Sequence, residues 1–241
     1  MKIFNQNRIF GAQRVVDEFA KSHKVGYCRK PFADAERMEA NRPFTASAAR
    51  AVPLSVMCLG AATKTEDQGS TPKCAAFSAS SLAENILWRK TGVLPADIDP
   101  HALYAYAKSV DGDPDGDGTT LTAVCQALLA KGIFDKAKCA VRTIYSPFDV
   151  RAVVHRYGCC LLGLDISDEW YRGNTEISNT SAPLVGGHAV VCPGYDQDGP
   201  WIQNSWGTAW GQNGFAHLTW PAFNRQFMYG AFVSGCYRDM V

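Results

Sequence analysis

The sequence has almost no net charge and no long apolar run, and both absences narrow the range of functions. Its 24 Lys and Arg residues nearly balance its 23 Asp and Glu residues, so the formal net charge is +1. A chain this close to neutrality has no overall field that would attract nucleic acid. No segment approaches the roughly 18 apolar residues that a membrane-spanning helix needs. We therefore expect neither nucleic acid nor a membrane among its partners.

The sequence also lacks a secretory signal peptide and any Cys-x-x-Cys pair. The segment Met1–Arg8 has no apolar core of the kind that a Sec signal requires. The nine cysteines are odd in number and scattered. These features favour a reducing compartment, because structural disulfides form mainly in oxidising ones. We expect synthesis in the cytoplasm, and later export by a non-Sec route or packaging into a phage particle is left open.

A histidine and an asparagine stand sixteen residues apart in two apolar, strand-like segments. His188 lies in Gly186–Val191, and Asn204 begins the run Asn-Ser-Trp-Gly that ends at Gly207. The amide of Asn204 can hold the imidazole of His188 in one tautomer, and the Trp206 ring can cover that hydrogen bond from water. A histidine oriented in this way is suited to activate a nucleophile, and a thiol is its natural partner.

The candidate thiol lies well upstream. Cys74 stands six residues after Gln68 and is followed by Ala-Phe-Ser, at the expected start of a helix. With His188 and the complete Asn-Ser-Trp-Gly-x-x-Trp-Gly run from Asn204, this order and spacing resemble the papain-like cysteine peptidases, in a divergent form of bacterial or phage type. The resemblance extends from about Pro53 to the C-terminus.

Each of these residues also has a purely structural interpretation. A lone buried cysteine at the start of a helix is more often a small core residue than a nucleophile. A histidine in an apolar strand can be a satisfied core residue, and Asn-Ser-Trp-Gly can be a strand that ends in a turn. Their joint occurrence in one order and at one set of spacings favours the catalytic interpretation.

The resemblance implies an α+β, two-lobed papain-like fold, in which a helical lobe is followed by an antiparallel β-rich lobe. We expect residues 1–45 to form an N-terminal extension or short pro-segment, and residues 46–241 to form the peptidase domain. Within this domain the helical lobe spans about 74–135 and the β-rich lobe about 140–241. The active site is expected in the cleft between the two lobes.

The resemblance also implies a role for each catalytic residue. Cys74 is the nucleophile, as a thiolate that the first turn of its helix and His188 stabilise. His188 is the general acid and base, and Asn204 orients it. The side-chain amide of Gln68 and the backbone N–H of Cys74 donate to the oxyanion. Trp206 shelters the histidine–asparagine contact, and no metal or organic cofactor is required.

The segment just before the nucleophile departs from the family pattern. Thr71, Pro72 and Lys73 stand where the family has a disulfide cysteine, a glycine and a serine, and Ala75 replaces its tryptophan. Because Pro72 restricts φ where the family has glycine, we expect the oxyanion loop to follow a different path. No catalytic group is lost, and Lys73 places a positive charge beside the thiol.

Two sets of residues are expected to line the substrate cleft. Gly116, Gly118 and Thr119 lie about forty residues after Cys74, where the family has a glycine-rich segment that binds substrate backbone as an extra strand. The remaining expected contacts flank the catalytic histidine, on its own and neighbouring segments: Ile166, Gly187, Ala189 and Trp206. Gly187 supplies neither charge nor bulk, and Ile166 and Ala189 are expected walls of the pocket, which favours an apolar side chain at the second substrate position before the cleaved bond.

The loop with these glycines has the acidic sequence Asp111-Gly-Asp-Pro-Asp-Gly-Asp-Gly118, which is also compatible with a calcium loop. An EF-hand register from Asp111 places Gly116 correctly at position six, but position twelve is Thr122 instead of the bidentate glutamate. The register two residues further on lacks this glutamate as well. We interpret the loop as solvated, and a cation there is left open.

Hydrophobic periodicity and capping residues predict most of the elements along the chain, and the family resemblance implies the helix that begins at Cys74. The expected helices span 12–23, 74–90, 100–109, 121–131 and 148–157. The expected strands span 159–166, 188–194, 201–205 and 215–219. The small residues of 44–50 are interpreted as a linker.

The sequence therefore predicts a thiol endopeptidase, a monomer, that cleaves protein or peptide substrates through an acyl-enzyme. Two alternatives use the same residues. An acyltransferase or transpeptidase would pass the acyl group to an amine instead of water, and a catalytically silent binding module would keep only the fold. The N-terminal segment has two interpretations as well, since its excess of basic residues suits either an inhibitory pro-segment or a structural extension packed outside.

Overall fold

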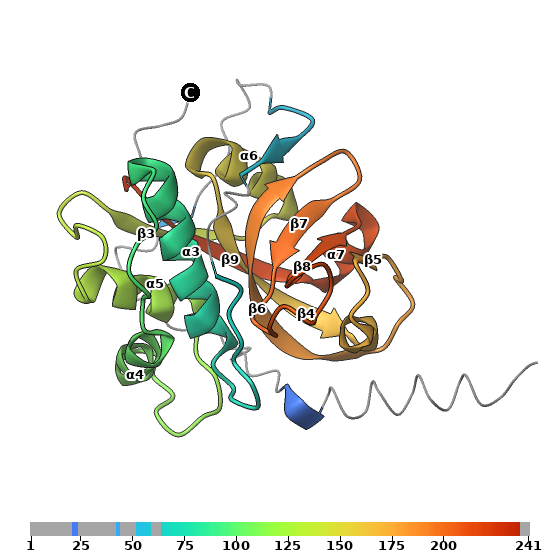
Figure 1. Cartoon of the computed structure of the whole chain (residues 1–241), viewed down its shortest axis with the longest axis horizontal. Coiled ribbons are helices and arrows are strands. Elements are labelled where there is room, and N and C mark those ends of the chain that lie inside the picture. The colour runs from blue at the N-terminus through green and yellow to red at the C-terminus, as the bar shows by residue number, and fades with distance from the viewer. Residues whose placement is uncertain (1–20, 24–41, 44–51, 59–63, 237–241) are drawn as a thin grey trace, which may run out of the picture.

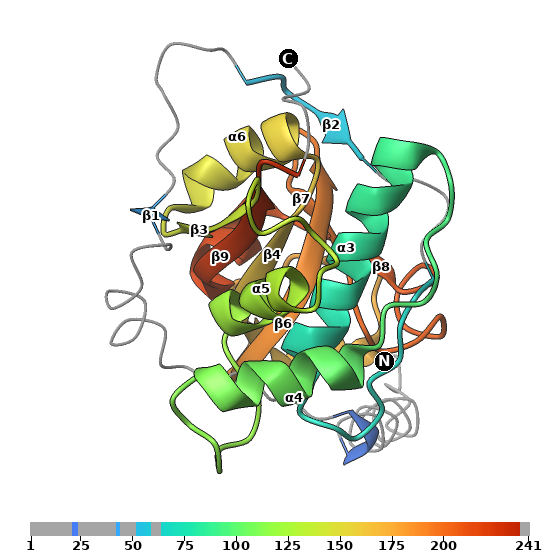
Figure 2. The same ribbon diagram turned by 90° about the vertical axis from the view of Figure 1, so that its left-hand side faces the viewer.

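The computed structural model describes residues 21–23, 42–43, 52–58 and 64–236, and it places three helices beside a large sheet (Figure 1). The helices are α3 (Cys74–Thr91), α4 (Pro100–Val110) and α5 (Leu121–Ala130). A fourth, α6 (Pro147–Tyr157), lies on the other side of the sheet from α3 (Figure 2). All four confirm the helices expected from the sequence, to within one residue at each end.

The sheet is mostly antiparallel. In the described chain its strands lie in the order β1-β3-β9-β4-β6-β7-β8-β5, and β2 also pairs with β6. The parallel pairs are at the two ends of this order, β1 with β3 and β5 with β8. The bounds are β1 Arg42–Pro43, β2 Val56–Met57, β3 Ala140–Ile144, β4 Cys160–Ser167, β5 Glu176–Ile177, β6 Leu184–Tyr195, β7 Pro200–Gln203, β8 Phe215–Leu218 and β9 Phe227–Ser234.

Two short helical segments complete the β-rich side: the 3-10 helix η1 (Asp168–Arg172) after β4, and α7 (Trp220–Gln226) before β9. Helices first and an antiparallel sheet second is the arrangement expected for the α+β, two-lobed fold. No helix in the described ranges is both long and apolar enough to cross a membrane.

The sheet separates two hydrophobic cores, and side chains of the central strands alternate between them. In β6, Val191 packs in the core under α3, α4 and α5, whereas Val190 packs in the core on the opposite side. In β4, Leu161 and Leu162 alternate in the same way. Because successive strand residues point to opposite faces, β4 and β6 are apolar along nearly their whole length.

Helix α3 lies close against the sheet because its first four turns carry small side chains. Cys74–Ile86 is buried throughout, and most of these residues are Ala or Ser. Two polar contacts fix the helix to the sheet. The hydroxyl of Ser78 donates to the carbonyl oxygen of Ala189 in β6 at 2.9 Å, and the amide of Asn85 donates to Gln203 in β7 at 3.0 Å.

Strand β9 and helix α7 were not expected from the sequence. The side chains of β9 pack into the hydrophobic cores on both sides of the sheet, so its residues are apolar on both faces and show no alternation. Such a run cannot be assigned by periodicity alone. Helix α7 has seven residues, too few for a helical repeat to stand out.

Two strand predictions were correct except at their ends, and two other predictions concern residues that lie partly or wholly outside the described ranges. β6 begins at Leu184, four residues before the predicted strand, and β7 ends at Gln203, so Asn204 lies just beyond it. Of the predicted helix 12–23, the structure describes residues 21–23, and residues 21 and 22 are helical. The predicted linker 44–50 lies outside the described residues.

We predict that Ser78→Ala destabilises the protein by about 1 kcal/mol, because it leaves the buried Ala189 carbonyl without its donor. Urea unfolding measures the change. The matched control is Ser81→Ala on the same helix: Ser81 is 3% exposed and Ser78 2% exposed, but within the described chain the Ser81 hydroxyl makes no bond to the sheet. Equal destabilisation by both variants would contradict a specific role for the Ser78 contact.

Candidate active site

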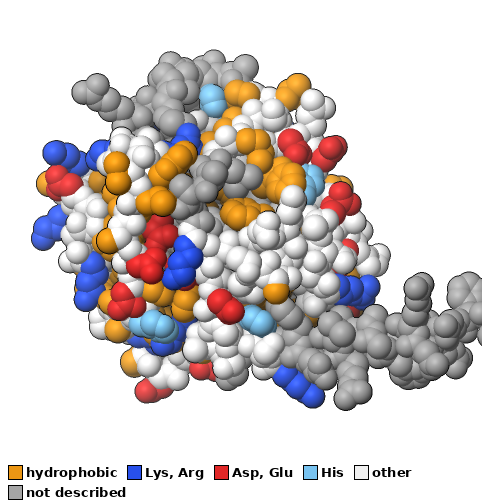
Figure 3. Space-filling model, viewed as in Figure 1, with side chains coloured by type: hydrophobic (Ala, Val, Ile, Leu, Met, Phe, Trp, Pro, Cys, Tyr) orange, Lys and Arg blue, Asp and Glu red, His pale blue; other side chains and the backbone are white. Residues whose placement is uncertain are grey.

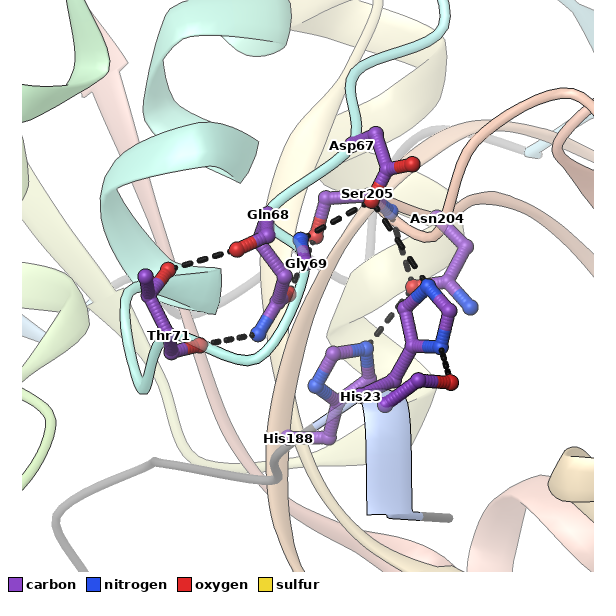
Figure 4. Close-up of polar contacts among 9 residues, drawn as sticks. His23, Asp67, Gln68, Gly69, Thr71, His188, Asn204 and Ser205 are labelled. Atoms are coloured by element: carbon purple, nitrogen blue, oxygen red, sulfur yellow. Dashed lines mark hydrogen bonds and ion pairs between the residues drawn. The ribbon is translucent and has the colours of Figure 1, made fainter. Parts of the chain in front are cut away.

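The imidazole of His188 is held in one orientation by Asn204. His188 lies in β6 and has no exposed surface, and its Nε2 is 2.7 Å from Oδ1 of Asn204 (Figure 4). The same oxygen accepts the backbone N–H of Ser205 at 2.8 Å. Because a backbone N–H can only donate, Oδ1 is an acceptor, so Nε2 of His188 must carry the proton in this contact. The predicted orienting role of Asn204 matches this geometry.

The other ring nitrogen of His188 is the one available for proton transfer. Nδ1 is buried and has no hydrogen-bond partner within the described chain. A general base needs such a nitrogen within reach of the proton that it accepts.

Aromatic rings enclose the histidine. Trp206 lies over His188 with ring centroids 4.7 Å apart, and Tyr171 stacks on Trp206 at 5.4 Å with the planes only 7° apart. Trp170 meets the edge of the His188 ring, and the Nε1–H of Trp210 donates to the backbone oxygen of Trp170. Trp206 thus covers the histidine as predicted, whereas the sequence did not point to Tyr171 or Trp170.

This enclosure keeps His188 neutral. Burial lowers the pKa of His188 to about 4, helped by the nearby charge of His23, and the Asn204 hydrogen bond opposes the shift only in part. A neutral imidazole is a proton acceptor at neutral pH. The charged form needs a compensating anion, which a thiolate at Cys74 would supply.

Helix α3 places Cys74 at its first residue, as predicted. Cys74 has no exposed surface. One turn further on, Ser78 is bonded to Ala189, the residue after His188, so the start of α3 is fixed to the histidine strand. The first N–H groups of a helix have no helical acceptor, and they favour negative charge on the nearby thiol.

Gln68 is joined to the asparagine segment by two contacts. Its backbone N–H donates to the Ser205 carbonyl at 2.8 Å, and its Oε1 accepts the Ser205 hydroxyl at 2.7 Å. Its Nε2 donates to the carbonyl of Thr71 at 2.8 Å (Figure 4). Since Ser205 follows Asn204, the structure brings the predicted oxyanion donor and the predicted orienting residue together.

Lys73 points away from the nucleophile toward α4. Its Nζ is 3.1 Å from Nδ1 of His101 and lies 5.2 Å from the centre of the Tyr104 ring. The side chain is therefore held by the neighbouring helix. The expectation that Lys73 adds positive charge beside the thiol is not supported by this geometry.

Two of the residues expected to contact substrate are buried, and a third lies in strand β6 beside the histidine. Ile166 and Ala189 have no exposed surface and belong to the two cores, so neither forms an accessible wall in this structure. Gly187 lies in β6 opposite Asp165 of β4, directly before His188.

The predicted glycine-rich segment forms an internally bonded loop between α4 and α5. The hydroxyl of Thr119 is buried and donates to Asp111 at 2.8 Å, and Lys108 pairs with Asp111 at 3.0 Å. The Gly118 carbonyl accepts from Lys108 as well. At Gly116 a Cβ atom would collide with the carboxylate of Asp113. Gly118 also has a φ of 77°, which favours glycine. Substrate binding by this segment stays a prediction.

One contact near the histidine was not foreseen. The ring of His23, from the N-terminal segment, lies 5.8 Å from that of Trp206, and its Nε2 is 3.6 Å from the carboxylate of Asp67 (Figure 4). Asp67 in turn bridges to Trp206 through the backbone. No sequence pattern marks His23, because this contact joins segments far apart in the chain.

One group of carboxylates in the described chain has the spacing of a cation site. Ligand oxygens of Glu66, Glu84 and Asp97 lie within 4.8 Å of one another. Lys64 is 3.3 Å from Asp97 and 3.7 Å from Glu66, so it already supplies a positive charge to the cluster. The acidic loop 111–117 does not form such a group.

Comparison with known proteins points to one class. No family model matches the chain. It is 27% identical to cathepsin B-like cysteine proteinase 3 of Caenorhabditis elegans over 53% of this chain and 38% of that protein. It is 25% identical to papain of Carica papaya over 74% of this chain and 57% of that protein. Xylellain, a cysteine protease from Xylella fastidiosa, has a similar structure, with a TM-score of 0.69, 16% identity, and coverage of 88% and 96%.

The fold is that of the papain-like cysteine proteases, and the proteins that the chain resembles in sequence are cysteine proteases. The resemblance recognised from the motifs is therefore confirmed. It spans about two fifths to three fifths of the length of the curated relatives cited here.

We predict that Glu84→Gln removes a loss of stability that wild type shows between pH 5 and pH 8. Burial raises the pKa of Glu84 from 4.5 to about 7. The folded state thus binds a proton that the unfolded state releases, so wild-type stability falls as pH rises from about 4.5 to 7. Glutamine keeps the acceptor oxygen for Ser80 and Ile98 and removes this loss.

Unfolding curves at several pH values measure the effect. The control is Asp135→Asn, which removes an exposed carboxylate. Wild type and Glu84→Gln showing the same change in stability between pH 5 and pH 8 would contradict the assignment.

Proposed function

We propose that the protein is a thiol endopeptidase that hydrolyses protein or peptide substrates as a monomer through Cys74, His188, Asn204 and Gln68. The observation that carries the proposal is the orientation of His188. Its Nε2–H is bound to Asn204, and its buried Nδ1 has no partner in the described chain. A core histidine usually satisfies both ring nitrogens, whereas a general base must keep one available.

The proposed reaction has two halves. The Cys74 thiol first gives its proton to Nδ1 of His188. The resulting thiolate attacks the peptide carbonyl carbon, and the oxyanion that forms accepts hydrogen bonds from the Gln68 side chain and the Cys74 backbone N–H. Nδ1 of His188 gives its proton to the leaving amine, which leaves the acyl group on sulfur. His188 then takes a proton from water, the hydroxide attacks the thioester carbonyl, and the acid product departs as the thiolate reforms.

The connection through Ser205 supports this assignment of Gln68 and Asn204. Its hydroxyl and carbonyl bind Gln68, and its backbone N–H binds the amide of Asn204. One residue therefore sets both the oxyanion donor and the orienter relative to each other. The oxyanion and the imidazole act on the same reacting carbon, so their relative position matters for catalysis.

We predict that Cys74→Ala abolishes peptide hydrolysis without loss of fold, and that His188→Ala does nearly the same, because the two residues act as one unit. Asn204→Ala should lose less activity, since Asn204 transfers no proton. Turnover of a fluorogenic peptide mixture, with circular dichroism as the folding control, measures this. Wild-type activity in Cys74→Ala would refute the assignment.

A thiol-directed epoxide separates an enzyme from a silent module. We expect one equivalent to label wild type at Cys74, with much slower labelling of His188→Ala. The buried thiols of Cys125 and Cys159 serve as internal controls, because burial raises their pKa well above that of a free thiol. Slow labelling spread over several cysteines would favour the silent module. An added amine that captures the acyl group more efficiently than water would favour the acyltransferase.

We predict that the thiolate raises the pKa of His188. In Cys74→Ser the imidazole should titrate near the value that burial, the Asn204 hydrogen bond and the charge of His23 together impose, a pKa of about 4. In wild type a neighbouring thiolate should shift the apparent pKa of the pair upward by more than one unit, and kcat/KM should be bell-shaped in pH. Nuclear magnetic resonance of the imidazole, followed through a pH titration of both proteins, measures the pKa of His188. Identical titration in both proteins would rule out the ion pair.

We further propose that residues 1–45 act as an inhibitory pro-segment. The contacts of His23 with Trp206 and Asp67 support this, because they join the segment to residues beside the proposed catalytic histidine. Cleavage between about Phe44 and Val52 should then raise activity. Mass spectrometry of aged wild type and Cys74→Ala tests it: cleavage in wild type alone supports self-processing, and cleavage in neither rejects the proposal.

A further inference from the structure

A cavity of about 600 Å³ lies on the β5–β8–β7 side of the sheet, apart from the proposed catalytic residues. Its lining includes Glu176, Asp196, Asp198, Trp201, Gln212 and His217. Figure 3 shows acidic side chains gathered with a histidine and apolar side chains on this side of the molecule. The proposed peptidase mechanism uses none of these residues.

Strand register explains why these side chains meet. His217 of β8 is the direct partner of Glu176 in β5 and of Trp201 in β7. Directly paired residues project from the same face of a sheet, so the three form a row across three adjacent strands. The neighbouring residues Ile177, Ile202 and Ala216 face the core. The row therefore stands on the outer face.

Asp196 fixes the aromatic side chains at the floor of the cavity. Its Oδ1 is 3.0 Å from Nε2 of His217, and its Oδ2 accepts the Nε1–H of Trp201 at 3.0 Å. Backbone N–H groups of Asp198 and Gly199 also donate to it. Burial by itself would raise the pKa of Asp196, but these donors hold the pKa below its ordinary value. Asp196 is thus an anion with its lone pairs already used.

The other two carboxylates are available to a ligand. Glu176 and Asp198 are exposed, and neither forms an ion pair within the described chain. The lining contains no Lys or Arg. Arg151 donates to the backbone oxygen of Asp196 at 3.5 Å, and its guanidinium lies over the Trp220 ring at 4.4 Å. The cavity therefore combines uncompensated negative charge with an aromatic ring.

We propose that this cavity binds the cationic side chain of a protein, with arginine favoured over lysine. A guanidinium can stack on the Trp201 ring while its N–H groups reach Glu176 and Asp198, and a planar fork suits both contacts. The ligand oxygens do not form one of the close groups typical of metal binding in the described chain. The proposal does not depend on peptidase activity, although β7 carries Trp201 three residues before Asn204.

The test is a titration of the full chain with N-acetylarginine amide, N-acetyllysine amide and N-acetylcitrulline amide. The indole N–H resonance of Trp201 is the readout, assigned by its loss in Trp201→Phe. We expect the arginine probe to shift this resonance with a dissociation constant on the order of millimolar, and the lysine probe to bind several-fold more weakly. The citrulline probe, which keeps the shape and lacks the charge, should not shift it.

Charge removal provides the decisive comparison. The double variant Glu176→Gln/Asp198→Asn should weaken arginine binding by about tenfold, which equals about 1.4 kcal/mol. Asp115→Asn/Asp117→Asn is the matched control, since it removes the same charge from the exposed loop between α4 and α5. Equal shifts by citrulline and arginine, equal weakening by the two double variants, or no shift of the Trp201 resonance would each overturn the proposal.

Discussion

The hydrogen bond between His188 and Asn204 is the interaction on which the candidate site depends. Its direction is fixed by a second hydrogen bond, because the Ser205 backbone N–H can only donate to the same amide oxygen. Those two contacts decide which ring nitrogen carries the proton. Trp206 covers them, and in a setting without water a hydrogen bond is electrostatically stronger. The catalytic proposal therefore rests on a rigid and dry contact.

The candidate site also depends on the small side chains of α3. They allow the helix to lie directly against β6, with Ser78 bonded to the residue that follows His188. A larger residue at these positions would move the start of the helix away from the histidine strand. The packing of α3 thus sets the relative position of Cys74 and His188, and burial at this interface also makes His188 neutral.

Much of the fold and of the site could be read from local pattern. Helices α4, α5 and α6 were predicted with accurate ends, because their periodicity and capping residues are local properties, whereas the family resemblance indicated α3. The resemblance of the motifs around Cys74 and His188 to a known family supplied the rest. Strand β9 could not be found in this way. Its side chains pack into the cores on both sides of the sheet, so its sequence lacks the alternation of apolar and polar residues on which strand prediction relies.

The residues predicted to bind substrate also show that spacing in the sequence does not reveal tertiary contacts. Gly116 and Gly118 have the expected spacing, yet their loop closes on Asp111 and Lys108 through bonds that spacing does not reveal. Lys73 stands next to the nucleophile in sequence, but its side chain lies against α4. Neighbours in sequence point in directions that only packing decides.

The sequence by itself determined the identity and order of the reactive groups, the helices, and the continuous apolar runs that suit β4 and β6 to the centre of the sheet. Tertiary structure alone decided which nitrogen of His188 is available, that His23 lies over Trp206, and that Glu176, Trp201 and His217 form one row. The physical reason is that a hydrogen bond, a ring contact or a strand register joins residues far apart in the chain. Its geometry is therefore not contained in either local sequence.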